Sequence, residues 1–307
     1  MVSSDFFQHI LRGPREDIYT RLADTLVGDR FSHGEDLREA EEVLHEVYRS
    51  QIRELQKQSP TPLLADLLLW RQDLRGLKNY IKRQYFDLDV SAVSSRYDDE
   101  QWDRLWEGLE TDLPPIFGGV LNRLRDSIEP SPEEPQVFDA AFDSATLRAL
   151  GRIGKRFSSE WMNEYWKRLD AVRGVEFLLR GQALGMEEEA LDVLLGGRED
   201  RKLFVALREE SEEEWPRLLR TFMPGIEDQA IVEKDGTERI RAFVHAGDRW
   251  VMDHVRDGRF FPFGAERVFA CMVGLEAEGY NMGVSVVGRA NDVAADQLSE
   301  HLRACYV

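Results

Sequence analysis

The sequence predicts an all-α protein built from three related helical units. Only 11 of its 307 residues are proline, and in most segments apolar residues recur at i, i+3, i+4 and i+7, as amphipathic helices require. Residues 284–287 form the one run that competes as a strand, and this run suits a buried helix equally well. One helical pattern returns after about 100 residues, which indicates internally related units.

The clearest helix is predicted over residues 63–85. Its apolar residues lie three or four positions apart, so they share one face. They are Leu67, Trp70, Leu74, Leu77 and Ile81. The same pattern predicts further helices over residues 34–58, 99–109, 119–128, 138–157, 159–181, 187–195, 198–210, 212–222, 236–257, 264–279 and 292–305.

Two offsets describe the internal repeat. Residues 74–82 resemble residues 172–180 without a gap at an offset of 98, and an offset of 107 carries Gly181 onto Gly288 and Leu191 onto Leu298. Chance similarity between helices of equal period is the alternative explanation. Polar connectors that do not suit a continuous helix occur at 129–135 and 233–236. We therefore predict three helical repeats, at 1–132 with an N-terminal extension, at 133–235 and at 236–307.

The charge balance excludes several classes of partner. The chain has 58 acidic and 40 basic residues and a formal net charge of -18, which disfavours nucleic-acid binding and adhesion to anionic lipid. Its densest apolar run, 63–70, is too short for a membrane span and contains Asp66. The first residues lack the pattern of a signal peptide. The sequence thus predicts a cytoplasmic protein without direct membrane insertion.

No pattern typical of a catalytic, cofactor or metal site emerges. Residues 151–156 approach a phosphate-binding loop but have Arg156 where Ser or Thr is needed. His245 and His254 are nine positions apart, which does not form the metal-binding face of a zinc helix, and we expect both to be partly exposed. Cys271 and Cys305 are expected to be buried small hydrophobes. We predict no catalytic residue, no cofactor and no metal.

A basic stripe departs from the acidic composition. Arg71, Arg75, Lys78 and Lys82 are spaced by four, three and four residues, so they share a helix face. One interpretation is a solvated face that pairs with neighbouring acids. The other is a docking surface for an acidic or carbonyl-rich partner, such as the C-terminal ends of helices.

The C-terminal motifs resemble the ending of the C subunit of V/A-type ATPases, whose eukaryotic counterpart is the d subunit of V-ATPase. They are Phe-Gly-Ala-Glu-Arg-Val-Phe-Ala at 263–270, Glu-Ala-Glu at 276–278, Val-Gly-Arg at 287–289, and Leu-Arg and Tyr-Val at 302–303 and 306–307. Residues 73–78 are similar to the family's Asp-Leu-Arg-Asn-Leu-Lys helix, and residues 170–180 occupy the second expected place. The resemblance covers about 37 to 307.

This resemblance implies a funnel of three helical domains that catalyses nothing itself. It implies a rotor component that sits on the membrane c ring, which is made of proteolipid, and accepts the D and F subunits of the central stalk in its socket. Torque would pass through it between ATP chemistry and proton or sodium transport. It would be peripheral on the inner face of the membrane through the complex.

Some residues depart from the family pattern. Ala265 and Arg267 replace prolines, Gly76 replaces an asparagine, and Gly283 stands where the third repeated helix is expected to carry a cation. The missing cation at Gly283 suggests an alternative function, a free-standing helical adaptor or regulator derived from the same family.

The candidate partner-binding residues are Arg71, Arg75, Lys78, Lys82, Arg173, Arg180 and Arg289. Against each stands the interpretation of an ordinary ion pair. Trp161, Tyr165 and Trp166 are either core residues or part of the partner contact.

Overall fold

A computed structural model describes residues 1–31, 37, 40–86, 88, 97–108, 115–127, 135–157, 159–188, 191, 195, 201–226 and 236–307. Every regular element within these ranges is a helix, which confirms the all-α prediction. The chain divides into two compact units. Unit 1 comprises Met1–Leu69 and Val251–Val307, and unit 2 comprises Trp70–Trp250. The three-repeat boundaries and the funnel remain predictions, and both predicted connectors lie almost entirely outside the described residues.

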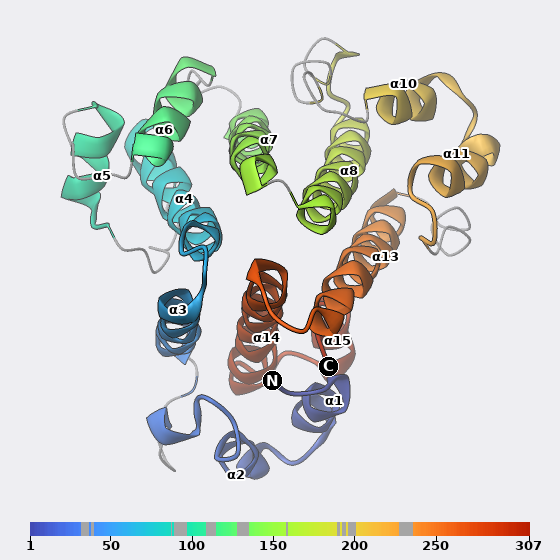
Figure 1. The fold of residues 1–307 in the computed structure, drawn as a ribbon. Coiled ribbons are helices and arrows are strands. Elements are labelled where there is room, and N and C mark those ends of the chain that lie inside the picture. Colours follow the sequence, from blue (N-terminus) through green and yellow to red (C-terminus); the bar gives the residue numbers. More distant parts are fainter. Residues whose placement is uncertain are drawn as a thin grey trace. The chain divides into compact units, whose positions relative to one another are not determined.

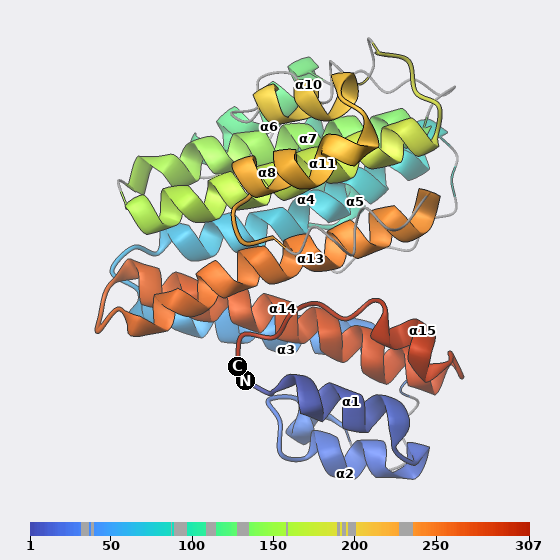
Figure 2. The ribbon, with the colours of Figure 1, turned by 90° about the vertical axis from the view of Figure 1, so that its right-hand side faces the viewer.

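Unit 1 is organised around one long helix near the C-terminus, which packs against α3 and α1. Its α-helices are α1 (Ser4–Arg12), α2 (Ile18–Leu22), α3 (Ala40–Gln58), α14 (Ala265–Ala290) and α15 (Ala295–Ser299) (Figures 1 and 2). Short 3-10 turns are η1 (Arg15–Asp17), η2 (Gly28–Arg30) and η6 (Gly258–Phe260). The sequence did not predict α1 or α2.

Glycines let other chain segments approach α14 closely. A Cβ at Gly279 would lie 2.8 Å from Cγ of Tyr48, and a Cβ at Gly274 would lie 2.8 Å from Cγ of Tyr306. The sequence predicts that this helix ends at residue 279, but the helix continues to Ala290, so that prediction was wrong. Its glycines allow close packing instead of ending the helix, and its buried face continues through Ser285 and Val286.

The predicted helix over 292–305 was also wrong. Only α15 is helical there, and residues 302–307 form a tail without regular secondary structure that contacts α14. Asn281 holds this tail, because its Nδ2 donates to the Arg303 carbonyl at 2.9 Å and its Oδ1 accepts from the Arg303 N–H at 2.7 Å. Arg256 also donates to the Cys305 carbonyl. These bonds replace those that a helix would have made.

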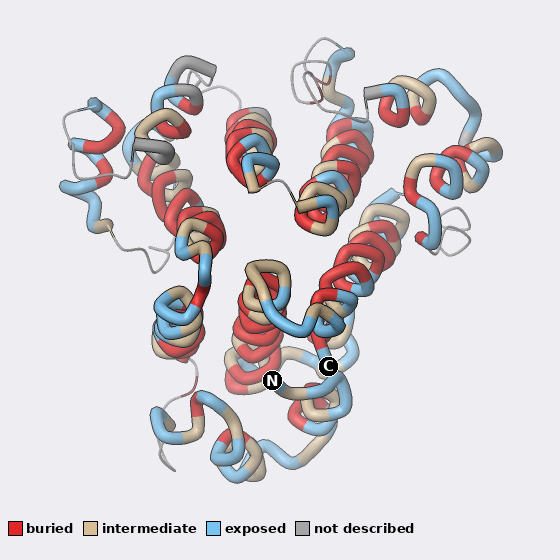
Figure 3. The backbone as a smooth tube through the Cα atoms, viewed as in Figure 1, coloured by how far each residue is buried: buried red, intermediate tan, exposed pale blue. Residues whose placement is uncertain are grey.

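Unit 2 is a set of long helices with shorter ones packed on them. They are the main part of α4 (Leu63–Phe86), α5 (Asp99–Trp106), α6 (Pro115–Ser127), α7 (Pro135–Gly154), α8 (Glu160–Ala183), α10 (Arg201–Glu209), α11 (Trp215–Phe222) and most of α13 (Gly236–Asp257), with 3-10 turns η4 (Lys155–Phe157) and η5 (Glu212–Glu214). In this unit α7 packs on α6 and α8, and α10 packs on α8 and α11. Buried residues run along α4, α7, α8 and α13 (Figure 3). The predicted helices over 63–85 and 236–257 are confirmed, and most of the one over 187–195 lies outside the described residues.

Glycines also set helix contacts in unit 2. A Cβ at Gly174 would lie 2.2 Å from Cζ of Phe204, so α10 packs closely on α8 at this glycine. A Cβ at Gly247 would lie 2.6 Å from Cγ1 of Val172, so α13 approaches α8 at this point. Tyr165 and Trp166 are buried core residues, while Trp161 is partly exposed.

The offset of 107 recurs in the structure as one helix-ending motif. At the end of α8, Gly185 has φ +66° and the Met186 N–H donates to the Gly181 carbonyl at 2.9 Å. At the end of α14, Asp292 has φ +61° and the Val293 N–H donates to the Gly288 carbonyl at 3.0 Å. Both are the left-handed helix ending known as the Schellman motif.

The leucine that follows each motif is also equivalent. A Cβ at Gly181 would lie 2.3 Å from Cδ2 of Leu191, and a Cβ at Gly288 would lie 2.3 Å from Cδ2 of Leu298. Each leucine thus covers the glycine at the start of its motif. The two segments therefore share a helix ending and a covering leucine at the offset of 107, and the three-repeat assignment stays a prediction.

Candidate partner-binding surfaces

The basic stripe of α4 is not a uniform exposed surface. Arg75 is exposed, whereas Arg71 is partly buried and the side chains of Lys78 and Lys82 are each only 16% exposed. The two lysines lie one helical turn apart, because residues i and i+4 share a face.

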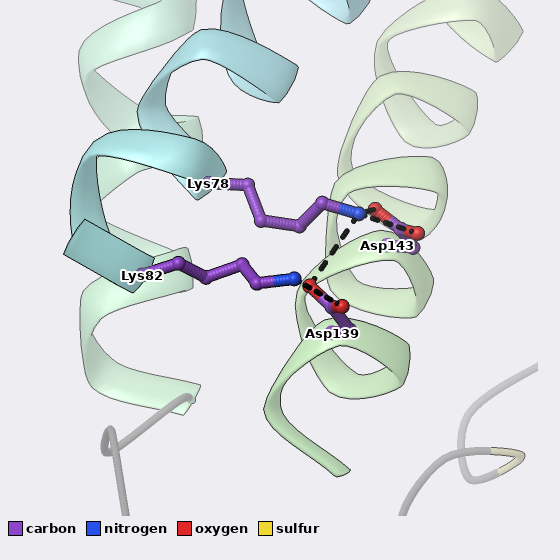
Figure 4. Close-up of polar contacts among 4 residues, drawn as sticks. All are labelled: Lys78, Lys82, Asp139 and Asp143. Carbon is purple, nitrogen blue, oxygen red and sulfur yellow. Dashed lines mark hydrogen bonds and ion pairs between the residues drawn. The ribbon is translucent and has the colours of Figure 1, made fainter. Parts of the chain in front are cut away.

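Lys78 and Lys82 form a ladder of ion pairs with α7 (Figure 4). Lys78 Nζ lies 2.8 Å from Oδ1 of Asp143 and 3.7 Å from Oδ1 of Asp139. Lys82 Nζ donates to Oδ2 of Asp139 at 2.7 Å. One carboxylate thus faces both lysines, and the pairs join α4 to α7 within unit 2.

The cations of α8 lie on either side of a buried acid. Arg173 pairs with Oε2 of Glu176, and Nη2 of Arg180 lies 2.8 Å from Oε1 of the same residue. The Glu176 side chain is only 8% exposed, so it needs both partners to offset its burial.

Charged residues of two other helices of unit 2 also act on Arg173. Burial by itself lowers the pKa of the Arg173 guanidinium, but the charges of Glu176 and Asp248 on α13 outweigh it, so that pKa is raised. The positive charge of Arg71 on α4 acts against them. Arg173 therefore stays charged, and Arg71 lies within electrostatic range of it.

Arg289 belongs to unit 1 and binds a loop. Its Nη2 donates to the Gly13 carbonyl at 3.2 Å. Arg15 lies at the same end of α14, where it donates to the Ala290 carbonyl at 2.5 Å and to Oδ1 of Asp292 at 2.8 Å. A guanidinium at these carbonyls complements the negative end of the helix dipole.

Six of the seven candidate residues lie in unit 2, and Arg289 lies in unit 1. The ion-pair interpretation describes Lys78, Lys82, Arg173 and Arg180, each of which contacts an acid of its own unit. Arg71 is within range of Arg173, Arg75 is the exposed member of the stripe, and Arg289 lies in the other unit. Contact of any of them with a partner protein stays a prediction.

The acidic motif at 276–278 has a structural role in unit 1. Oε1 of buried Glu278 accepts from the Tyr48 phenol at 2.9 Å, and its Oε2 accepts from the Val2 N–H at 2.8 Å. Burial, and then the charge and hydrogen bond of Glu278, raise the pKa of Tyr48. This carboxylate joins α14 to α3 and to the N-terminal segment.

Comparison with protein families decides what these features belong to. The family model described as ATP synthase (C/AC39) subunit matches residues 8–301. The chain belongs to this family. A search of the curated proteins gave no match. The resemblance to the C subunit of V/A-type ATPases is thereby confirmed for nearly the whole chain.

The C/AC39 family motif at 263–270 forms the turn into α14. Gly264 precedes the helix with φ +118°, a conformation that only glycine adopts without strain. Arg267, which replaces a proline of the family pattern, donates from Nη1 to the carbonyls of Phe261 and Pro262, each at 3.3 Å. This departure thus supplies bonds that hold the preceding loop.

The same loop presents a feature that the sequence pattern did not reveal. Phe260 and Phe263 of this C/AC39 family member are 71% and 82% exposed. The signal was available as the run Phe-Phe-Pro-Phe at 260–263, but such a run also suits a core segment. Only the structure shows that two of these rings face solvent.

Within the described residues, no helix is long and apolar enough to cross a membrane, and no cluster of His, Cys, Asp or Glu suits a metal ion.

Cys305 is buried as predicted, and burial raises the pKa of the Cys271 and Cys305 thiols. Two expectations were wrong. Cys271 is only partly buried, because it lies at the edge of the buried face of α14, and His254 is buried because the last turns of α13 pack within unit 1.

Proposed function

We propose that this chain is the non-catalytic rotor component of a V/A-type ATPase, a socket that couples the D and F subunits of the central stalk to the membrane c ring of proteolipid. Torque then passes through it between ATP chemistry and proton or sodium transport. Its place is peripheral, on the cytoplasmic face of the membrane. The observation that carries the proposal is the C/AC39 family match over residues 8–301.

The physical character of the chain supports this role. A torque-bearing element needs stiffness, which packed helices provide because protein interiors are close-packed and nearly incompressible. Phe204 fills the space above Gly174, and Tyr48 fills the space above Gly279. Ion pairs such as Lys82 with Asp139 add links between helices.

Affinity purification tests the proposal. A tagged full-length chain is recovered from detergent-solubilised membranes of cells that express the complex, and the co-purifying proteins are identified by mass spectrometry. We expect the D and F subunits together with the proteolipid. Their absence, with the tagged chain recovered in folded form, would contradict the rotor assignment.

The second candidate is a free-standing helical adaptor or regulator derived from the same family. It rests on Gly283, where the family pattern has a cation and where a Cβ would meet nothing within 4 Å. Two results distinguish the candidates. An adaptor is recovered as a free chain or with non-ATPase partners, and restoring a cation by Gly283→Lys leaves its recovery unchanged.

A further inference from the structure

The loop between α13 and α14 carries the two most exposed large apolar side chains among the described residues. Phe260 is 71% and Phe263 is 82% exposed, ahead of Leu184 at 56%. We call residues 259–263 the Phe loop. Single exposed apolar residues are ordinary, but two aromatic rings within four positions form a small apolar knob.

The Phe loop is held in a defined shape. Arg267 binds the carbonyls of Phe261 and Pro262 from the following helix, and the Phe261 N–H donates to the Gly258 carbonyl at 3.3 Å. The Arg259 guanidinium stacks over the Phe260 ring at 4.9 Å. Rigid aromatic side chains lose little conformational entropy when a partner covers them, so this loop is preorganised for binding.

The charge of the Phe loop differs from that of the chain. Its one charged residue is Arg259, and Asp257, Glu266 and the exposed Arg267 flank it, so residues 257–267 are neutral overall, whereas the whole chain has a net charge of -18. Such a knob fits an apolar pocket that has carbonyl or acidic groups at its rim. Burying such rings away from water favours association, and aromatic and arginine residues are the usual centres of protein interfaces.

We propose that the Phe loop docks between helix ends of the membrane proteolipid ring, and this inference rests on the proposed function. A ring of membrane helices offers apolar side chains close to its surface. Its helix C-termini offer carbonyl groups to Arg259. Monomeric soluble proteins rarely expose large contiguous apolar patches, and the chain's negative charge disfavours a bare anionic lipid surface.

The test compares Phe260→Ser/Phe263→Ser with Leu184→Ser, a matched change at an exposed apolar residue of unit 2. Purified full-length variants are titrated onto purified proteolipid ring in detergent and, separately, onto the purified complex of the D and F subunits. We expect ring binding to weaken roughly 10- to 100-fold in the double serine variant. Binding to D and F should stay unchanged, as should both affinities of Leu184→Ser. Phe260→Leu/Phe263→Leu should restore most of the ring affinity.

Each outcome separates the loop assignment from the rotor assignment. If the wild-type chain does not bind the ring, the proposed function fails and the inference fails with it. If the wild type binds and the double serine variant binds within about twofold, the Phe loop is not the contact, and the proposed function stands. Loss of binding to D and F would also overturn the loop assignment. The loop assignment would also be overturned if the wild type bound protein-free vesicles of phosphatidylethanolamine and phosphatidylglycerol and the double serine variant did not.

Discussion

The Tyr48 phenol donates a 2.9 Å hydrogen bond to Oε1 of Glu278, joining α3 to α14 over a sequence separation of 230 residues. Tyr48→Phe leaves that carboxylate oxygen buried with one partner fewer. We expect the free energy of unfolding of unit 1 to fall by about 1–3 kcal/mol, measured by urea unfolding at neutral pH. Tyr85→Phe, at an exposed ring, is the control and should change stability by less than about 0.5 kcal/mol. Equal effects of the two substitutions would show that the Tyr48 bond contributes nothing.

The same pair predicts a loss of stability at alkaline pH. The pKa of Tyr48 is raised in the folded state, first by burial and then by Glu278, above its ordinary value of 10.0. The unfolded chain therefore releases the phenolic proton first, and this contribution is complete below pH 10 and declines as the pH rises. Between about pH 10 and 11, wild type should lose about 1 kcal/mol more than Tyr48→Phe. Parallel pH profiles would contradict the prediction.

Two glycines of α14 should respond oppositely to alanine. A Cβ at Gly279 would lie 2.8 Å from Cγ of Tyr48, so Gly279→Ala should destabilise unit 1 by about 1–3 kcal/mol. A Cβ at Gly283 meets nothing within 4 Å, so Gly283→Ala should stabilise the helix by about 0.5–1 kcal/mol. Thermal unfolding of the two variants checks both signs, and a shift in the same direction would refute the packing argument.

The C-terminal tail should depend on one amide. Asn281→Asp removes the Nδ2 donor to the Arg303 carbonyl and places a carboxylate in a buried site, at a cost of about 2–4 kcal/mol. Thermal unfolding measures this loss, and carboxypeptidase should remove the tail faster. Asn291→Asp, the same change at an exposed site, should cost less than about 1 kcal/mol. A tail as resistant as in the wild type would mean that other contacts hold it.

The ladder between α4 and α7 should show measurable coupling. A double-mutant cycle of Lys82→Met and Asp139→Asn should give a coupling free energy of about 0.5–1 kcal/mol that decreases in about 1 M salt. The reference is the more exposed pair Lys57 and Glu54, at 2.6 Å within α3, which should couple by less than about 0.5 kcal/mol. Equal coupling in both cycles would leave the ladder no stronger than an ordinary surface pair.

The sequence identified most helices because their signal is local. The pattern over 63–85 and 236–257 places apolar residues on one face, and the structure has helices over Leu63–Phe86 and Gly236–Asp257. Prediction from the sequence failed where a contact with a distant residue overrides the local pattern. The local pattern predicts a helix end at Gly279 because glycine disfavours helices, although the ring of Tyr48 requires its lack of a side chain.

For the basic stripe too, the sequence predicted the local arrangement of the residues but not their distant partners. Spacing alone placed Lys78 and Lys82 on one face, but their acids, Asp143 and Asp139, lie 65 and 57 residues further along the chain. Only the packing of α4 and α7 brings these charges together. The exposure of Phe260 and Phe263 was hidden for a similar reason, since a short apolar run does not reveal whether another segment covers it.

By itself the sequence determined the all-α class, the position of the long helices, the recurrence at an offset of 107 and, through its C-terminal motifs, the family. These properties depend on residues close in the chain or on motif identity. The tertiary structure decided which glycines receive a neighbouring ring, which acids pair with the basic stripe, where the tail runs and which phenylalanines remain uncovered. Each of these depends on the approach of residues far apart in sequence, and that approach is set by how all the helices of a unit pack together.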